Sequence, residues 1–292
     1  MATFQPTIQQ FKKTSTILII IYCTFAILKN IFNVSFISKT WALDVVLVLG
    51  IISIYHSLLW YGKKSTFVFF LITSLVAWSF ETLSIHTSFP FGKYYYTDLL
   101  PGKLGDVPIL IMPAYFSVGY LSWVISHVIC NRQNSNYSKY DFVLIPAIAA
   151  FIMAAWDLTF DPLSSTVTDI WRWQNGGSYF GVPLQNFFGW YLCVFIIYIL
   201  FFQYLKNKKT KSEAYINRKV FWLYPTLAYL FFSIDSLTRP FRAIFKYDEN
   251  TPVPQHFGEM GQWQSYDIYY TLALISVFTM ILIAVLTIII IF

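Results

Sequence analysis

Long runs of apolar residues dominate the chain, and each approaches or reaches the ~20 residues that one bilayer crossing needs. Eight stretches qualify, namely residues 14–37, 41–60, 66–84, 108–129, 142–158, 186–205, 220–237 and 269–292. The first is the weakest, because Lys29, Asn30 and Asn33 interrupt it. The last is the clearest, because it carries no charge. The pattern predicts an all-α polytopic membrane protein of about eight transmembrane helices, forming a single integral membrane domain over residues 1–292.

The polar connections between these stretches are of two kinds. Those after the second, fourth and sixth stretches are short or basic: Tyr61–Lys64, Asn131–Tyr140 and Lys206–Lys219. Those after the third, fifth and seventh are long and rich in Pro, Gly and aromatic residues. Loops longer than about a dozen residues are usually functional or disordered. The aromatic content predicts ordered, partly re-entrant loops, which share one face of the membrane.

The distribution of charge predicts the orientation in the membrane. With eight spans and a cytoplasmic N-terminus, 12 of the 20 Lys and Arg residues fall on the cytoplasmic side, as the positive-inside rule requires. On the same topology, 12 of the 14 acids fall on the opposite side. We therefore expect both termini in the cytoplasm of a prokaryotic cell, with the acid- and aromatic-rich loops on the opposite face of its membrane.

Composition narrows the classes of protein that remain possible. Hydrophobic types make up 57% of the chain and charged types 12%, with a mean hydropathy of +0.57, whereas a soluble domain is about 25% charged. This excludes a soluble enzyme, a disordered chain and a disulfide-stapled secreted domain. The net charge of +6 comes without a clustered basic face, so no nucleic-acid partner is expected. Only four histidines are present, without metal-ligand spacing, so no metal or other cofactor is expected.

Three acids end the third, fifth and seventh stretches: Glu81, Asp157 and Asp235. Acids in membrane spans are costly and mark functional sites by default, although acids at helix ends can also be merely solvated. Odd-numbered spans run in the same direction, so the three acids could line one cavity. Asp161 follows Asp157 by four residues, on the same helix face. Two carboxyl groups so close disfavour joint ionisation, so that one can keep a proton and act as a general acid.

Two aromatic loops accompany these acids. Phe89–Tyr96 (FPFGKYYY) follows the third stretch, and Trp171–Pro183 (WRWQNGGSYFGVP) follows the fifth. Aromatic faces stabilise cations, although an interfacial aromatic belt is the alternative interpretation. The predicted substrate-binding residues are His86, Tyr94, Tyr95, Trp156, Trp171, Trp173, Tyr179, Asn186 and Trp190.

The same residues resemble a known family, the carotenoid biosynthesis membrane proteins, which include CruF-type carotenoid 1,2-hydratases and bisanhydrobacterioruberin hydratases. The resemblance lies in Glu81 with Pro90–Tyr96, in Ala155–Pro162 (AWDLTFDP) and in Trp171–Trp190, and covers a core of about 65–245. It implies a hydro-lyase that adds water across the terminal C1=C2 bond of an acyclic ψ-end group, giving a tertiary alcohol. The implied partners are water, membrane lipid and a carotenoid in the bilayer, such as lycopene, γ-carotene or a C50 analogue.

The acids and aromatic residues suit that chemistry without a cofactor. A carboxylic acid would protonate C-2, and a carboxylate-oriented water would capture the tertiary cation at C-1. We expect Asp157 or Glu81 to be the acid, and Asp161 and Asp235 to orient water or tune the acid.

Three other functions remain open at this point. An intramembrane carotenoid or terpenoid cyclase would form the same cation and close a ring instead, and the sequence does not separate it from a hydratase. An intramembrane prenyltransferase would use Asp157 and Asp161 to bind a diphosphate through Mg²⁺, but a second Asp-rich motif is missing. A non-enzymatic transporter would also place acids in its spans.

Overall fold

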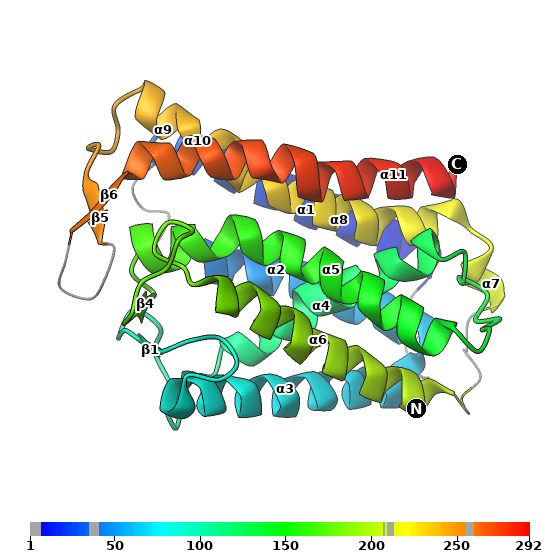
Figure 1. Ribbon diagram of the computed structural model, residues 1–292. Coiled ribbons are helices and arrows are strands. Elements are labelled where there is room, and N and C mark those ends of the chain that lie inside the picture. The colour runs from blue at the N-terminus through cyan, green and yellow to red at the C-terminus, as the bar shows by residue number, and fades with distance from the viewer. Residues whose placement is uncertain (1–6, 35–40, 207, 209–212, 255–259) are drawn as a thin grey trace.

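The computed structural model describes residues 7–34, 41–206, 208, 213–254 and 260–292. In these ranges eight long helices lie side by side (Figure 1). They are α1 (Ile8–Asn30), α2 (Trp41–Trp60), α3 (Gly62–Thr87), α4 (Ile111–Ile129), α5 (Asp141–Asp161), α6 (Leu184–Leu205), α8 (Lys219–Thr238) and a final helix in which α10 (Ser265–Ser276) continues through the π-helical η2 (Val277–Ile281) into α11 (Leu282–Ile291). Each predicted stretch forms a helix, so the predicted fold class is confirmed.

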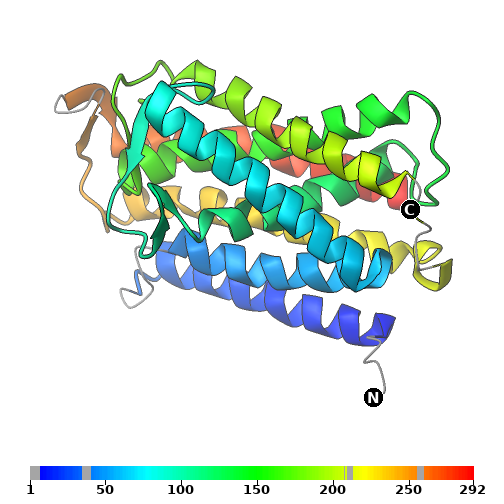
Figure 2. The same ribbon diagram turned by 90° about the horizontal axis from the view of Figure 1, so that it is seen from below.

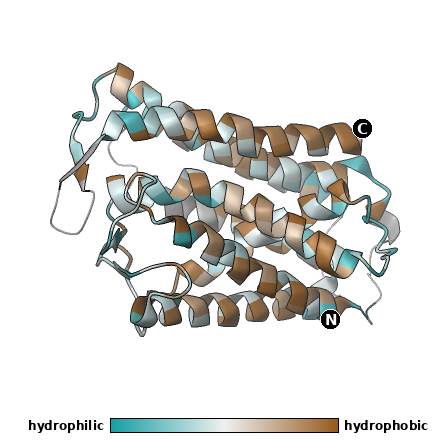
Figure 3. Cartoon of the chain, viewed as in Figure 1, coloured by the Kyte–Doolittle hydropathy of each residue, from teal (hydrophilic) through white to brown (hydrophobic). Residues whose placement is uncertain are grey.

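Six helical segments of the described chain are long and apolar enough to cross a membrane: Ile8–Asn30, Gly62–Thr87, Asp141–Val167, Leu184–Leu205, Lys219–Ile244 and Ser265–Ile291. Helix α4 is not among these six segments. Other helices surround it, since it packs on α2, α3, α5, α8 and α11. Its polar side chains Ser122, Ser126 and His127 are fully buried, so protein rather than lipid surrounds them. Hydrophobic residues line the helices, whereas hydrophilic residues gather at the two ends of the bundle (Figure 3).

Short elements divide between the two ends of the bundle (Figures 1 and 2). The beginning of α1, the end of α11 and the short α7 (Glu213–Ile216) lie at one end. The other end carries the predicted ordered loops, which follow α3, α5 and α8. Their elements are β1 (Tyr94–Tyr96), β2 (Lys103–Leu104), β3 (Val107–Pro108), η1 (Pro162–Val167), β4 (Trp171–Trp173), α9 (Pro240–Ile244), β5 (Pro252–Pro254) and β6 (Met260–Gln264).

The Pro-Gly turn of the first loop is held between α3 and α6. Ser84 of α3 accepts a hydrogen bond from the Phe91 amide at 3.1 Å and donates one to the Gly92 carbonyl at 2.9 Å. A Cβ atom on Gly189 of α6 would lie 2.7 Å from the Pro90 carbonyl oxygen and 2.8 Å from the Phe91 ring. Glycine is therefore required at position 189 for this close approach. The approach holds the Phe89–Tyr96 loop against the end of the bundle.

Candidate active site

A two-stranded antiparallel sheet joins the two aromatic loops. In β1 and β4, Tyr94 pairs with Trp173, and Tyr96 pairs with Trp171. Alternate residues of a strand point to the same face, so these four side chains share the face that is turned into the protein. Because β1 follows α3 and β4 follows α5, the sheet brings residues about 75 positions apart in the chain into contact.

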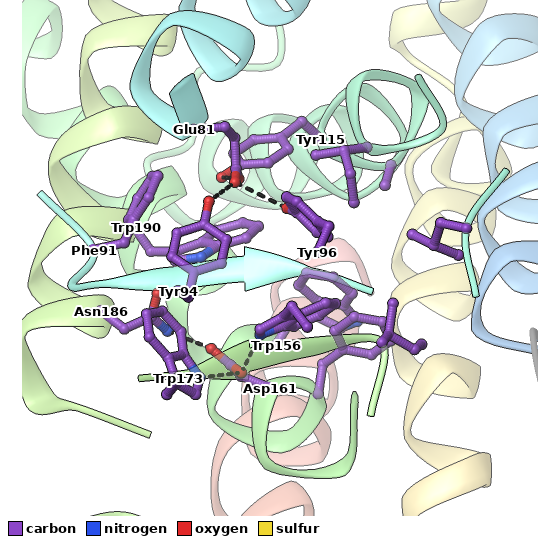
Figure 4. Close-up of a pocket in the computed structure, with 16 residues that line it drawn as sticks. Glu81, Phe91, Tyr94, Tyr96, Tyr115, Trp156, Asp161, Trp173, Asn186 and Trp190 are labelled. Atoms are coloured by element: carbon purple, nitrogen blue, oxygen red, sulfur yellow. Dashed lines mark hydrogen bonds between the residues drawn. The ribbon is translucent and has the colours of Figure 1, made fainter. Parts of the chain in front are cut away.

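Glu81 of α3 accepts hydrogen bonds from three tyrosines (Figure 4). Its Oε2 atom accepts from the hydroxyls of Tyr94 and, at 2.9 Å, Tyr96, while Oε1 accepts from Tyr115 of α4 at 2.7 Å. Burial raises the pKa of Tyr94 and of Tyr96 well above the usual value, and the nearby Glu81 charge raises both further. These phenols therefore stay protonated and serve as donors to a buried carboxylate.

The second acidic cluster is built around Asn186 at the start of α6. Its Nδ2 atom donates to Asp161 Oδ2 at 2.5 Å and to Asp157 Oδ2 at 3.1 Å, so a single amide bridges the two carboxyl groups. The indole nitrogens of Trp171 and Trp173 donate to Asp161 Oδ1 at 3.0 and 3.3 Å. The sheet thus contacts both acidic clusters, with its tyrosines at Glu81 and its tryptophans at Asp161.

All hydrogen-bond donors described for these three carboxyl groups are neutral, and none of the 16 residues that line the adjoining cavity is basic. Asp157 and Asp161 are each 1% exposed. Two buried ionised carboxylates joined through one amide would repel each other without a compensating cation. The arrangement therefore favours a proton shared by the Asp157–Asp161 pair.

The cavity between the clusters is small and aromatic (Figure 4). It offers about 50 Å³ to the centres of water molecules, several times the ~10–15 Å³ that one water needs on the same measure. Trp190 stacks on Tyr115 with centroids 4.4 Å apart, and Trp156 stacks on Phe160 at the same distance. Such ring faces can stabilise a cation held among them.

The cavity contains most of the residues predicted from the sequence. Its walls include Glu81, Tyr94, Trp156, Asp161, Trp171, Trp173, Asn186 and Trp190. Asp157 is absent from the walls but reaches them through Asn186.

Three of the predicted binding residues lie elsewhere. His86 is exposed at the end of α3 and pairs with Asp106 at 3.2 Å. Tyr95 points to the opposite face of the sheet from its two neighbours, since it occupies the intervening strand position. Tyr179 packs on Phe187 and donates its hydroxyl to the Leu158 carbonyl at 2.8 Å. Burial raises the pKa of Tyr179.

Of the three helix-end acids predicted to line one cavity, Glu81 lines it and Asp157 contacts it through Asn186, but the prediction is wrong for Asp235. This residue lines a second cavity and pairs with Arg239, one helical turn later, at 2.8 Å. Asn30 Nδ2 also donates to its Oδ1 atom at 3.0 Å. The physical reason is the position of α8, which packs on α1 and α10 rather than between α3 and α6.

Four residues that line the cavity were not predicted from the sequence although their rings help to form it: Phe91, Tyr96, Tyr115 and Phe160. The alternation of strand residues could have selected Tyr96 together with Tyr94. Tyr115 gives no such signal, because it lies inside an apolar stretch among other aromatic residues. Within the described ranges, no group of three or more His, Cys, Asp or Glu side chains is placed to hold a metal ion.

Fold and site together define a polytopic all-α membrane protein with an acid-lined aromatic cavity at one end of its helical bundle. Comparison with known proteins then gives the family: residues 41–239 match the carotenoid biosynthesis protein family, and the chain belongs to it. The chain is also similar to the bisanhydrobacterioruberin hydratase of Haloarcula japonica, with 27% identity over 130 residues. That alignment covers 44% of this chain and 42% of the relative. No solved structure matches the chain.

Proposed function

We propose that this protein is a carotenoid hydratase, which adds water across the terminal C1=C2 bond of an acyclic ψ-end group. The observation that carries the proposal is the Asp157–Asn186–Asp161 carboxyl pair beside an aromatic cavity. Family membership supports a role in carotenoid biosynthesis, and the name of the relative supports hydration as the reaction type. The substrate we propose is lycopene, γ-carotene or a C50 analogue.

The first step of the reaction is protonation of the alkene. Asp161 faces the cavity and Asp157 does not, so Asp161 delivers the proton that the pair holds. The π electrons of the double bond form the new C-2–H bond and leave a tertiary cation at C-1. Asp157 is the positioning residue, because it shares the Asn186 amide with Asp161.

The second step is capture of the cation by water. The rings of Trp156, Trp190 and Tyr115 surround the cavity, so their faces can stabilise the cation until water attacks C-1. The water must lose a proton, and the Glu81 carboxylate accepts it. Three phenol donors hold Glu81 in place for this role. The proton gained by Glu81 balances the one lost by the aspartate pair, so the net reaction is addition of one water. Before the next turnover this proton passes back from Glu81 to the aspartate pair.

The proposed orientation places this cavity on the non-cytoplasmic side of a prokaryotic cell membrane. Basic residues at the start of α3, in the α4–α5 connection and just after α6 lie at the end of the bundle that holds the beginning of α1 and the end of α11. The positive-inside rule favours that end as the cytoplasmic one. These residues include Lys63, Lys64, Arg132, Lys139, Lys206 and Lys208. The polyene would lie in the bilayer, with only its end group in the cavity.

The direct test is production of the protein in a host that accumulates lycopene, followed by mass analysis of the pigments. A hydratase gives a 1-hydroxy pigment, heavier than the substrate by one water. Asp106→Asn, which changes an exposed acid outside the cavity, is expected to retain the product and controls for expression. A pigment of unchanged mass with a ring at its end would replace this proposal with a cyclase. Lycopene left unaltered, with the protein present in the membrane, would reject both.

A further inference from the structure

A second cavity lies beside the first and is lined by charged side chains. Lys29 of α1, Asp235 of α8 and Arg239, which directly follows α8, line it, and it offers about 40 Å³ to the centres of water molecules. On the same measure one water needs ~10–15 Å³, so about three water molecules fit. The first cavity, in contrast, contains no basic residue in its lining.

Polar atoms around this second cavity lack protein partners. Arg239 is 6% exposed, and its Nε atom has no hydrogen-bond partner among the described residues. The Oδ1 atom of the fully buried Asn30, which binds Asp235 through its amide nitrogen, also lacks one there. Buried polar atoms in native proteins are paired with protein or with water in the great majority of cases. A cavity of this size beside an unpaired guanidinium nitrogen is therefore suited to hold water.

The second cavity touches both the active cavity and the protein surface. Trp156, Phe160 and Ile170 line both cavities and form the wall between them. On the outer side, Thr168 lines the second cavity and also an open polar recess that includes Asp169. The recess, the second cavity and the active cavity thus follow one another from the surface inwards.

Tyr96 separates the recess from the active cavity on a shorter path, because it lines both. Its hydroxyl donates to Glu81 at 2.9 Å, and its ring packs edge-on against Trp171 with centroids 5.9 Å apart. These contacts hold the Tyr96 side chain in the wall between the recess and the active cavity.

We propose that the second cavity is the water chamber of the hydratase, which admits water from the recess past Thr168 and releases it to the cation through the Trp156–Phe160 wall. This inference rests on the proposed function, because it concerns the second substrate of that reaction. It also explains why the active cavity can stay aromatic: water arrives from a separate polar store and is not held against the alkene.

The fate of the cation reports on the water supply. In heavy water the aspartate pair carries deuterium and transfers it to C-2. If water then attacks C-1, the product is a deuterated alcohol. If water is scarce, a C–H bond of a methyl group on C-1 breaks instead, its electrons form a double bond between C-1 and that methyl carbon, and the proton passes to a carboxylate. The resulting alkene isomer keeps deuterium at C-2, so the ratio of alcohol to deuterated alkene measures water capture against proton loss.

Ser236→Leu is the test, because Ser236 lines the second cavity and not the first. The variant and the wild type are assayed in membranes with lycopene in heavy water. We expect the ratio of alcohol to deuterated alkene to fall by about tenfold or more, which corresponds to ~1.4 kcal/mol of added barrier to capture. Ser79→Leu makes the same change at an exposed position of α3 and is expected to leave the ratio unchanged.

The possible results distinguish failure of the water-chamber proposal from failure of the proposed hydratase function. A wild-type protein that forms no alcohol contradicts the proposed function itself. A folded Ser236→Leu variant with the wild-type ratio shows that water enters by another route and overturns the chamber. An equal loss of alcohol and deuterated alkene also overturns it, because protonation has then been damaged. If Ser236→Leu does not accumulate in the membrane, Ser236→Val makes the same test with less added volume.

Discussion

Two acidic regions at the loop-bearing end of the described bundle differ in their partners. Asp157 and Asp161 bond to amide and indole donors, which are neutral. Asp235 pairs with Arg239, at the same spacing of four residues along a helix. An acid opposite a guanidinium is held ionised, whereas an acid opposite another acid can hold a proton. The difference supports the proposal that the first region transfers the proton, whereas the second pairs opposite charges and holds helices together.

The Asp235 region also connects parts of the chain that are distant in sequence. Asn30 of α1 donates to Asp235 and, at 2.9 Å, to Thr238. Arg242 donates to the Lys29 carbonyl at 2.6 Å. The Asp235 region, called the ionic region from here on, therefore connects the end of α1 to the end of α8 and to α9. The region of Glu81, Asp157 and Asp161, called the neutral region, instead connects α3, α5 and α6 through the β1–β4 sheet.

The largest expected effect is loss of activity on Asp161→Asn. The variant cannot deliver a proton to C-2, and general acid catalysis contributes ~10²–10⁴-fold to rates. We expect alcohol formation to fall by at least about 100-fold, with thermal stability unchanged or raised because one ionisable group fewer is buried without a compensating cation. Pigment analysis and thermal unfolding of the purified protein measure both. Retention of full activity would exclude Asp161 as the acid.

The next prediction concerns the ionic region. Asp235→Asn leaves Arg239 buried without its counter-charge, and removal of one partner from a buried ion pair costs ~3–5 kcal/mol. We expect a clear fall in the thermal unfolding temperature, opposite in sign to the effect of Asp161→Asn. Asp98→Asn, at an acid whose side chain is fully exposed, is the control. Equal stabilities for the Asp235 and Asp161 variants would remove the distinction between the two regions.

Much of this comparison could be predicted from the sequence. The eight helices could be located because each bilayer crossing requires a long apolar run. Glu81 and Asp161 stood out because acids are rare in membrane spans, and the two loop tryptophans stood out because they are packed into a loop beside these acids. The rotation and packing of α8 could not be predicted, because all its faces are apolar and only tertiary contacts decide which face meets which cavity. Asp235 was therefore assigned to the wrong cavity.

The aromatic wall of the cavity is expected to contribute less to the rate than the Asp161 acid does. Trp190→Leu keeps an apolar side chain but removes the ring stacked on Tyr115. Cation–π interactions are worth ~0.5–2 kcal/mol, so we expect alcohol formation to fall by about 2- to 30-fold. Trp263→Leu, at a tryptophan outside the cavity, is the matched control. A Trp190→Leu variant as active as this control would show that the ring does not stabilise the cation.

Tyr95 and Tyr96 lie on opposite faces of β1, so a matched pair of substitutions tests whether only the inward-facing hydroxyl supports activity. Tyr96→Phe removes a donor to Glu81, whereas Tyr95→Phe changes a hydroxyl on the opposite face. A hydrogen bond to a charged group is worth ~1.5–3 kcal/mol, so Tyr96→Phe should reduce activity by about 10- to 100-fold at most. The other two phenols still bind Glu81. Tyr95→Phe should stay near the wild type, and a larger loss for Tyr95→Phe would contradict the inward orientation of Tyr96.

The smallest effect is a pH dependence of stability at the edge of the ionic region. Burial raises the pKa of Asp248, but two hydrogen bonds from Arg242, at 2.6 and 2.7 Å, lower it by more. The net shift of the Asp248 pKa is therefore downward. A lowered pKa in the folded state contributes stability above the unfolded value of ~3.9, and this stability is lost as the pH falls through the folded value. We expect the unfolding temperature of the wild type to fall between about pH 5 and pH 3. In Asp248→Asn this part of the decrease should be absent, and identical pH profiles for the two proteins would show that the ion pair does not stabilise the fold.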